Sequence, residues 1–527
     1  MLELQMLLVT EGLAPKLKAP SHLAGELSLA CDMEVYPRSI AGHDRVIYFL
    51  ARSRYDHHLG LAYDALAVPP AAQDFEGTPE SYEVQGVKVT VKLCPRSAAN
   101  AAALRARLPF LVPQCIGLAT SVGLGDRLGL ATPGHVRAVA GSGLRPFFAQ
   151  QSIREMTRTG RSPQEVLDDA MWGVFQEGFR DGFGSDADHL KTAEDIDRCV
   201  AAGFTLFTID PGAHVDDAAD AASPAQLAEK FDALPWAGLE TTPADCRATY
   251  AGKRVVVEAG LPLVPSEADL LRAAAKYGKA IAHTARLYRH LAERKGDQPF
   301  ELEMSVDETA SPTSPFEHYF VASELRRLGV RWVSLAPRFI GRFEKGVDYI
   351  GDLAAFEQSF AQHAAIARAL GPYKLSIHSG SDKFSVYPIA AKLAGELVHV
   401  KTAGTSYVEA LRAVARVAPE LFRGILDFAC EHYEADRASY HVSAELGKVP
   451  RIAHLKDAEL PDLLDQFDAR EVLHVTYGSV LNAQTSDGSW RFREHLFDAL
   501  RQNEEAYAQV LESHLGRHIE PFSRQEA

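Results

Sequence analysis

Short apolar runs alternate with amphipathic helical stretches from about residue 110 onward. A continuous apolar strand followed by a helix is typical of a parallel sheet that is covered on both faces. The runs predicted as strands are residues 113–120, 144–149, 204–209, 300–304, 330–335, 374–378, 397–401 and 472–475. Eight strands over roughly 370 residues fit the size range of a barrel with insertions. The pattern therefore predicts an α/β fold with a TIM-like (β/α)8 barrel.

The first hundred residues have a different pattern. Residues 45–50 and 82–92 are predicted strands, and the second alternates polar and apolar side chains as a half-exposed strand does. An Asp- and Ala-rich stretch around 212–270 is expected to form an insertion in the barrel. The expected regions are an N-terminal α+β cap over 1–108, the catalytic barrel over 109–490 and a C-terminal helical segment over 491–527.

Composition narrows the class of protein. The 527-residue chain has 55 Lys+Arg against 70 Asp+Glu and a net charge of −15, which disfavours a nucleic-acid partner because such proteins need a basic surface. The chain has no apolar run of about 18 residues, so we expect no membrane span. Residues 1–10 lack a basic segment and a cleavage site, so no signal peptide is expected. Six Cys without CxxC spacing fit the reducing cytoplasm and argue against disulfides and Cys-ligated zinc.

In a barrel of this kind, polar residues at the carboxyl ends of the strands form the active site. Asp188, His189 and Lys191 follow a Gly-rich segment that is predicted to be a loop. Asp210 follows the predicted strand 204–209, which Pro and Gly end at the barrel rim. The alternatives are an ordinary polar loop for the first group and a helix N-cap for Asp210.

Two further strand ends carry side chains that can bind a metal. Glu303 lies inside an apolar strand, where a charge is costly unless it is paired or bound to a cation. His378 ends a strand and enters a Gly/Ser loop, as a metal-binding imidazole would. His189, Glu303 and His378 together form a two-His, one-carboxylate set for a divalent ion such as Zn, Mn or Ni. A structural ion pair for Glu303 and a hydrogen-bonded core position for His378 remain the alternatives.

Cations and small polar residues follow several of the same strands. Arg338 and Lys401 at the barrel mouth indicate a substrate carboxylate or phosphate, although ordinary salt bridges would also explain them. Arg127 lies in a Gly-rich segment after the first strand, where the backbone could approach an anion. The remaining candidates for substrate binding are Gln151, Ser379, Asp382 and Lys383. The sequence contains no P-loop, GxSxG or HExxH motif, which removes the usual NTPase, hydrolase and zincin classes.

Four of these segments together resemble the tagaturonate epimerase family: residues 125–135, 186–191, 376–383 and 401–407. The resemblance spans most of the chain. It implies metal-dependent interconversion of D-tagaturonate and D-fructuronate in hexuronate breakdown, and relatives act on tagatose and fructose. A more distant similarity to class II aldolases, at residues 188–189 and 377–381, implies zinc binding by His189 and His378 and proton transfer by Asp188.

The implied reaction inverts a carbon β to the ketone, whose C–H bond is not acidified. A retro-aldol cleavage followed by re-addition would invert it, with a Lewis acid on the ketone oxygen and a base for the β-hydroxyl. The catalytic candidates are Asp188, Asp210 and Lys191; Asp188 or Asp210 would be the base, and Lys191, Arg338 or Lys401 would hold a uronate carboxylate.

The rival mechanism is a hydride shuttle through a bound nicotinamide. The sequence lacks a dinucleotide-binding fingerprint, which argues against this mechanism. The alternative activities are a class II aldolase-like lyase and a sugar-binding subunit without turnover. The expected partner is a small sugar or sugar acid, and the oligomeric state stays open, with a homo-oligomer among the alternatives.

Overall fold

The computed structural model describes residues 21–54, 56–84, 87–257 and 261–523. Its centre is a closed barrel of eight strands in the order β10-β13-β14-β15-β16-β7-β8-β9, and every pairing around the ring is parallel. The strands are β7 (Ser121–Gly123), β8 (Arg145–Ser152), β9 (Gly184–Leu190), β10 (Leu206–Ile209), β13 (Glu301–Ser305), β14 (Ser334–Ala336), β15 (Lys374–Ile377) and β16 (Val398–Lys401). The predicted fold class is confirmed.

Three parts of the sequence-based strand assignment are wrong. Residues 472–475 lie in the helix α16 (Phe467–Val475), which is buried along almost its whole length and therefore shows no polar face. A short apolar run of this kind does not distinguish a strand from a buried helix. Residues 184–190, predicted as part of a loop, form the strand β9, whose polar side chains hide its strand character. The first strand begins at Ser121, just after the predicted run 113–120.

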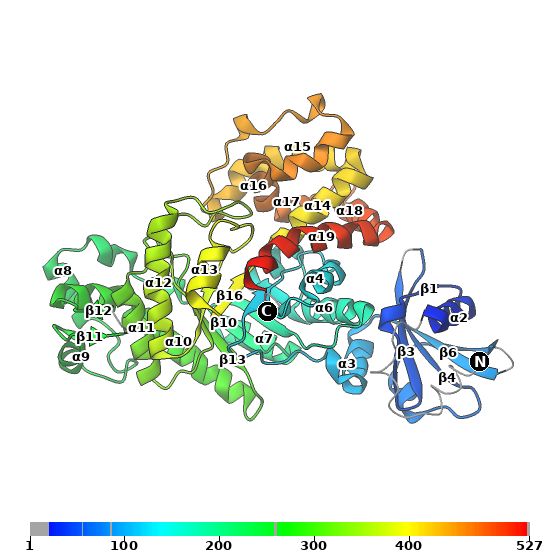
Figure 1. Ribbon diagram of the computed structural model, residues 1–527, viewed down its shortest axis with the longest axis horizontal. Helices are drawn as coiled ribbons and strands as arrows, with labels where there is room; N and C mark the ends of the chain where they lie inside the picture. The colour runs from blue at the N-terminus through cyan, green and yellow to red at the C-terminus, as the bar shows by residue number, and fades with distance from the viewer. Residues whose placement is uncertain (1–20, 55, 85–86, 258–260, 524–527) are drawn as a thin grey trace.

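Helices surround the barrel on its outer side (Figure 1). Around the ring they are α4 (Thr132–Val139), α5 (Ile153–Thr159), α6 (Pro163–Glu177), α7 (Ala193–Ala202), α10 (Glu267–Lys295), α11 (Pro315–Arg327), α12 (Leu353–Leu370) and α13 (Tyr387–Ala394). The longest, α10, begins at a capping box in which Ser266 and Asp269 each accept the other's backbone N–H. Because strands and helices share a continuous apolar core, the carboxyl ends of the strands are left for polar side chains.

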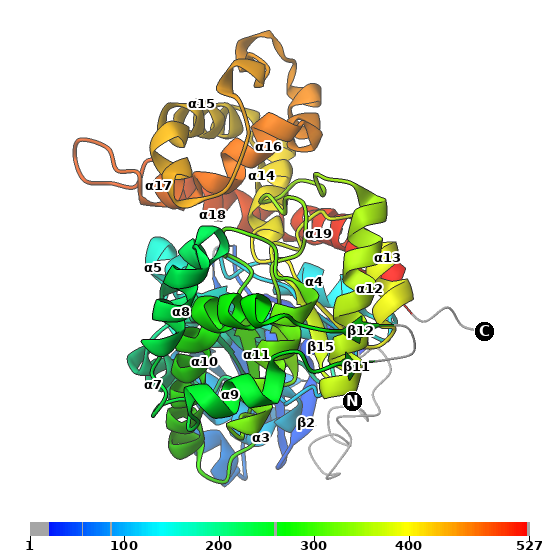
Figure 2. The ribbon, with the colours of Figure 1, turned by 90° about the vertical axis from the view of Figure 1, so that its left-hand side faces the viewer.

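Between β10 and α10 the chain forms a small excursion beside α10 (Figure 2). Its elements are α8 (Pro224–Asp232), α9 (Pro243–Tyr250) and the short antiparallel pair β11 (Val255–Val256) and β12 (Pro262–Leu263). The segment falls where the sequence predicts an insertion.

The N-terminal region is a six-stranded antiparallel sheet flanked by two helices. Its elements are α2 (Ser21–Cys31), β1 (Glu34–Val35), β2 (Ala41–His43), β3 (Val46–Arg52), β4 (His57–Asp64), β5 (Thr78–Val84), β6 (Val87–Pro95) and α3 (Ala98–Arg107). Residues 1–10, where the sequence predicts no signal peptide, lie outside the described residues.

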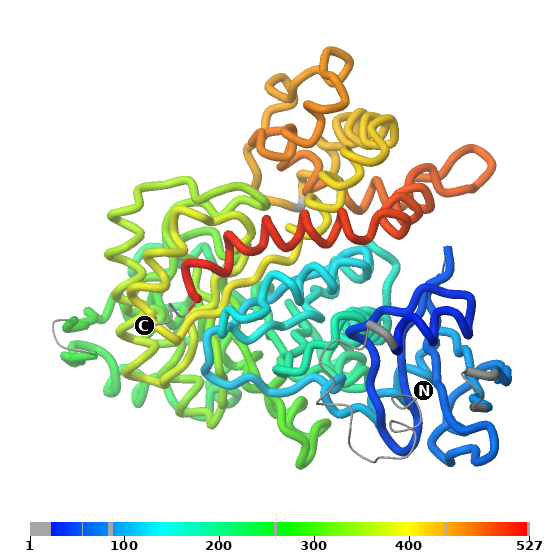
Figure 3. The backbone as a smooth tube through the Cα atoms, turned by 45° about the vertical axis from the view of Figure 1, so that its right-hand side comes forward, coloured from blue at the N-terminus to red at the C-terminus, as the bar shows by residue number. Residues whose placement is uncertain are grey.

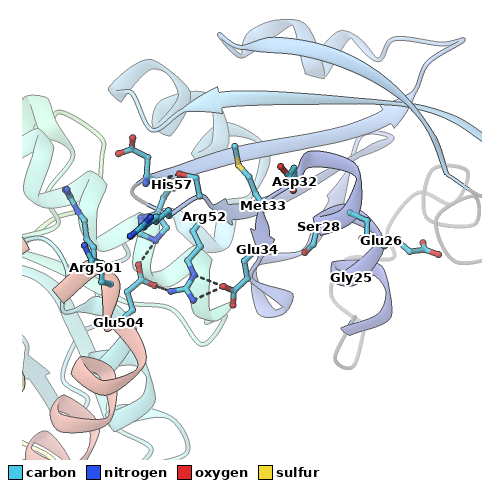
Figure 4. Close-up of a pocket in the computed structure, with 15 residues that line it drawn as sticks. Gly25, Glu26, Ser28, Asp32, Met33, Glu34, Arg52, His57, Arg501 and Glu504 are labelled. Atoms are coloured by element: carbon cyan, nitrogen blue, oxygen red, sulfur yellow. Dashed lines mark hydrogen bonds and ion pairs between the residues drawn. The ribbon is translucent and has the colours of Figure 1, made fainter. Parts of the chain in front are cut away.

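Glu504 joins this sheet to the C-terminal helices (Figure 4). His57 lies 2.7 Å and Arg52 3.3 Å from its carboxylate, and the Tyr36 hydroxyl donates a hydrogen bond of 2.5 Å to it. Arg52 also pairs with Glu34 at 2.7 Å. The N-terminal sheet is thus fastened to a helix that begins more than 400 residues later, at Glu504.

A helical group stands on the barrel (Figure 2). Its helices are α14 (Thr405–Val417), α15 (Pro419–Asp436), α16, α17 (Tyr477–Asn482), α18 (Arg493–Gln502) and α19 (Glu504–Ile519). The last of these, α19, runs back along α4 (Figure 3), which brings its final turns to the loop after β15. In the part of the chain that the structure describes, none of the helices is long and apolar enough to cross a membrane.

Candidate active site

Lys401 lies among three carboxylates at the end of β16. Its ammonium is 2.8 Å from Asp186, 2.8 Å from Asp188 and 2.7 Å from Glu303, and all four side chains are buried. Burial disfavours the charged lysine, yet the carboxylates hold the pKa of Lys401 well above its ordinary value. In spite of burial, Lys401 therefore holds the pKa values of Asp188 and Glu303 below their ordinary values.

A bulge at the end of β9 brings two adjacent residues to the same site. Successive side chains of a strand point to opposite faces. The pairing of β9 with β10 shifts by one residue, from Ala187 opposite Phe207 to Leu190 opposite Ile209, and His189 adopts a left-handed conformation with φ of 54°. Bulges of this kind redirect side chains, so Asp188 and His189 both reach the barrel mouth.

His189 and His378 converge as the sequence predicts. Their ring centroids are 5.1 Å apart in an edge-to-face arrangement. His378 Nε2 lies 2.6 Å from Glu303 Oε1, and its Nδ1 lies 3.3 Å from Asp307. His189 Nδ1 lies 3.1 Å from Asp210.

The charges around the two rings change their protonation. Burial alone would lower both pKa values. Asp188 and Asp210 nevertheless raise the pKa of His189 to about 10. For His378, Asp307 and Glu303 outweigh burial and the nearby ammonium of Lys401, and raise its pKa to about 9. The surplus of carboxylate at the site therefore favours a bound cation.

Asp188, His189 and His378 offer one ligand atom each, and these atoms all lie within 4.8 Å of one another. Imidazole and carboxylate donors suit a divalent transition ion. This triad differs from the predicted set in its acid: Glu303 is not part of it, although it contacts His378. Both oxygens of Glu303 are engaged, one with Lys401 and His378 and the other with the hydroxyl of Ser334 at 2.5 Å.

The two predicted bases lie on either side of His189. Asp188 Oδ1 contacts Lys401, and its other oxygen accepts a hydrogen bond from Gln150 at 3.0 Å. Asp210 accepts the backbone N–H of Gly212 at 2.8 Å and lies 3.3 Å from the ammonium of Lys191. The Lys191 side chain is 56% exposed, so it lies at the edge of the site.

Two cavities open beside the triad and share four lining residues: Lys345, His378, Ser379 and Tyr440. The first continues to Asp307, Glu308 and Arg338. The second continues to Arg127, Asp188, His189 and Lys401. The predicted residues Arg127, Ser379, Arg338 and Lys401 are therefore brought together around the two histidines.

Gln151, Asp382 and Lys383, predicted to bind substrate, do not line either cavity. Asp382 pairs with Arg470 and His514, at 2.9 and 2.5 Å. Lys383 donates to backbone carbonyls, among them those of Glu344 and Ser381 at 2.7 and 2.9 Å. Gln151 is buried within β8.

Among the cavity residues that sequence reasoning missed are Asp307, Lys345 and Tyr440. Asp307 follows β13 by two residues, so the strand-end rule could have found it. Lys345 lies nine residues beyond β14, and Tyr440 follows α15 outside the barrel, so neither stands at a strand end. No local sequence signal marks the last two.

Comparison with known proteins identifies the family. The family model of the tagaturonate epimerases (UxaE) matches residues 36–522. The chain belongs to the tagaturonate epimerase family.

Alignments with relatives of this tagaturonate epimerase family member extend over nearly the whole chain. The tagaturonate/fructuronate epimerase of Thermotoga maritima is 45% identical over 487 residues, which cover 92% of this chain and 96% of the relative. The native crystal structure of fructuronate-tagaturonate epimerase UxaE from Cohnella laeviribosi superposes with a TM-score of 0.87 at 39% identity, covering 95% of this chain and 99% of that one. Its complex with two glycerols gives a TM-score of 0.88, also at 39% identity, covering 96% and 100%.

Proposed function

We propose that this enzyme interconverts D-tagaturonate and D-fructuronate by a metal-dependent retro-aldol and aldol sequence. Membership of the epimerase family and the names of the relatives support the substrates. The observation that supports the chemistry is the triad of Asp188, His189 and His378, which lies beside cavities at the barrel mouth.

His189, His378 and Asp188 would hold the ion, and their nitrogen and oxygen donors fit a divalent metal such as Zn, Mn or Ni. When bound, a divalent ion there supplies a Lewis acid for the ketone oxygen of the sugar acid. Glu303 contacts His378 Nε2, and Asp210 contacts His189 Nδ1. Both carboxylates therefore orient an imidazole, as acidic neighbours of metal-binding histidines do.

The chain's own part in the reaction is to move one proton. The hydroxyl on the inverted carbon gives its proton to the carboxylate of Asp210, which is not among the residues that would hold the ion, as the bond between the α and β carbons breaks. The resulting aldehyde turns within the cavity, the bond re-forms on its other face and the same proton returns. No atom is gained or lost, so the product is the epimer. Lys401 keeps Asp188 ionised, as a carboxylate that would hold the ion must be.

Turnover of tagaturonate in heavy water, followed by NMR, tests the proposal. The retro-aldol route leaves the hydrogen on the inverted carbon in place, so we expect epimerisation without deuterium at that carbon. We also expect activity to fall after chelation and to return with Mn²⁺, Ni²⁺ or Zn²⁺. Stoichiometric release of three-carbon fragments would instead indicate the aldolase-like lyase, and activity that is indifferent to chelation would contradict the metal.

A further inference from the structure

An anionic substrate enters a site that is already rich in carboxylates. Asp188 and Glu155 line the second cavity, and Asp307 and Glu308 line the first. The carboxylate of a substrate in these cavities would be repelled by the carboxylates that line them, because like charges repel. Binding of a uronate therefore requires a cationic side chain that is not already paired with a carboxylate of the protein.

Most of the cationic side chains at the cavities already have carboxylate partners within the protein. Lys401 has three carboxylate partners. Arg127 lies 2.9 Å from Glu155 and stacks on the ring of Tyr477, and Arg154 lies 3.3 Å from Glu308. Lys401 and Arg127 would each have to give up a partner to bind a substrate carboxylate, which offsets most of the gain. The charge of Arg154 is already balanced by Glu308.

Lys345 differs from these cations. Its ammonium donates a hydrogen bond of 2.6 Å to the hydroxyl of Ser379, and no carboxylate of the described chain lies within 4 Å of it. It lines both cavities beside His378. An ammonium has three donors, so two remain for a ligand.

We propose that Lys345 binds the substrate carboxylate and so sets the preference of this enzyme for a uronate over the uncharged sugar. The inference rests on the proposed function, because it names which group at that site recognises the acid. Ser379, on the loop that follows His378, accepts a hydrogen bond from the ammonium and so holds it beside that histidine.

The backbone around Lys345 is held in place before any substrate binds. Lys383 donates to the carbonyls of Glu344 and Val347, on either side of Lys345. Arg470 donates to the carbonyl of Gly346 at 2.7 Å. Gly346 has φ of 74°, and a Cβ there would lie 2.8 Å from His474, so only glycine fits.

These contacts indicate a structural role for Lys383, which the sequence predicted to bind substrate: it supports the loop that carries Lys345. The Lys383 side chain is fully buried, and burial lowers its pKa to about 7. In the structure it contacts carbonyls of the loop that carries Lys345. A fixed loop leaves only the side chain of Lys345 to be ordered on binding, which preserves affinity.

Arg338 is the nearest competitor for the carboxylate. It lines only the first cavity, and its guanidinium donates to the carbonyl of Asp307 at 3.1 Å. Arg338→Met therefore serves as a control that removes a cavity cation without touching Lys345.

The test compares Lys345→Met, Lys345→Arg and Arg338→Met on tagaturonate and on its primary amide, which has the same skeleton without the charge. Dissociation constants by calorimetry and KM and kcat by NMR give separate readouts. We expect Lys345→Met to weaken binding of the acid and raise its KM by about 10- to 100-fold, the range of a charge-assisted hydrogen bond. We expect the amide to change less than about threefold and Lys345→Arg to recover part of the loss.

Equal losses on acid and amide would overturn the inference, as would selective loss of the acid in Arg338→Met alone. Epimerisation by the wild-type enzyme with an equal loss on both ligands would leave the proposed function intact. Binding of the acid that depends on Lys345 in a protein without epimerase activity would refute the function and keep the inference.

Discussion

Two clusters of one aspartate and two histidines occur among the residues that the structure describes. The barrel-mouth triad is Asp188, His189 and His378; the α19 triad is Asp382, His514 and His518. Both bring their ligand atoms within 4.8 Å of one another. Residue type and distance therefore do not separate a metal site from a structural cluster.

Their neighbours separate them. Arg470 donates to Asp382 Oδ2 at 2.9 Å and lies 3.3 Å from His514 Nε2. The backbone N–H of Asp382 donates to His518 Nε2 at 2.9 Å, which uses the lone pair a metal would need. None of the α19 triad lines the two site cavities, whereas every member of the barrel-mouth triad lines one.

The charges around the two triads also differ, and this difference again favours a cation at the barrel mouth. Carboxylates raise the pKa of His189 to about 10 in spite of burial, whereas burial lowers the pKa of His518 to about 3. The barrel mouth has unbalanced negative charge, and Arg470 balances it at α19. We infer that the first triad is built for a cation, and that the second fastens α19 to the loop after β15.

The strongest test replaces one histidine in each triad. We expect His378→Gln to lose its metal and to lower kcat/KM by roughly 10³- to 10⁴-fold, because the Lewis acid goes with the ligand. We expect His514→Gln to keep the full metal stoichiometry. Metal analysis of the folded, desalted proteins measures both. Full occupancy in His378→Gln, or metal loss in His514→Gln alone, would reverse the comparison.

Removal of the cation at α19 is expected to be the next largest effect. Arg470→Met removes one partner from each of two buried carboxylates, although Asp382 keeps His514 and Glu409 keeps Arg412. We therefore expect a cost of about 3 kcal/mol, at the low end for breaking a buried ion pair. Chemical denaturation monitored by circular dichroism gives the change, and Arg470→Lys, which keeps the charge but not the fork, should lose less. A loss below about 1 kcal/mol would show that the α19 triad does not depend on its arginine.

Much of the barrel follows from the sequence. Apolar runs such as 204–209 and 374–378 are strands because a sheet covered on both faces needs apolar residues on both sides. The strand β9 was not recognised by the same rule because Asp186 and Asp188 are polar residues that pair with Lys401 inside the barrel. Its bulge depends on pairing with β10, a tertiary contact that no local pattern contains.

Only part of the site could be predicted from the sequence, because only some of its residues stand at strand ends. His189 and His378 stand at strand ends, so topology alone brings them together. Asp382 and Lys383 follow the same strand as His378, yet the chain turns at Ser379 and Asp382, which both have positive φ. This turn directs the latter two residues toward partners on other elements, such as Arg470 on α16. Lys345 reaches the cavity from a long loop, which no spacing rule predicts.

A pH series on the α19 triad tests the comparison at its finest scale. Asp382, His514 and Arg470 face His518, and burial keeps it neutral in the folded protein down to about pH 3. The unfolded chain protonates a histidine near pH 6.5, so it binds more protons below that value and stability falls as the pH falls through 6.5. His518→Gln should accept the same backbone N–H without this loss. We expect the wild-type free energy of unfolding, relative to His518→Gln, to fall by about 2 kcal/mol between pH 7.5 and pH 5. Urea titrations at both pH values measure the difference. A difference that stays constant with pH would mean that the pKa of His518 is the same in the folded and the unfolded protein, and a difference that rises as the pH falls would mean that His518 is charged in the fold, as the histidines of the barrel mouth are. Either result would remove the contrast between the two triads.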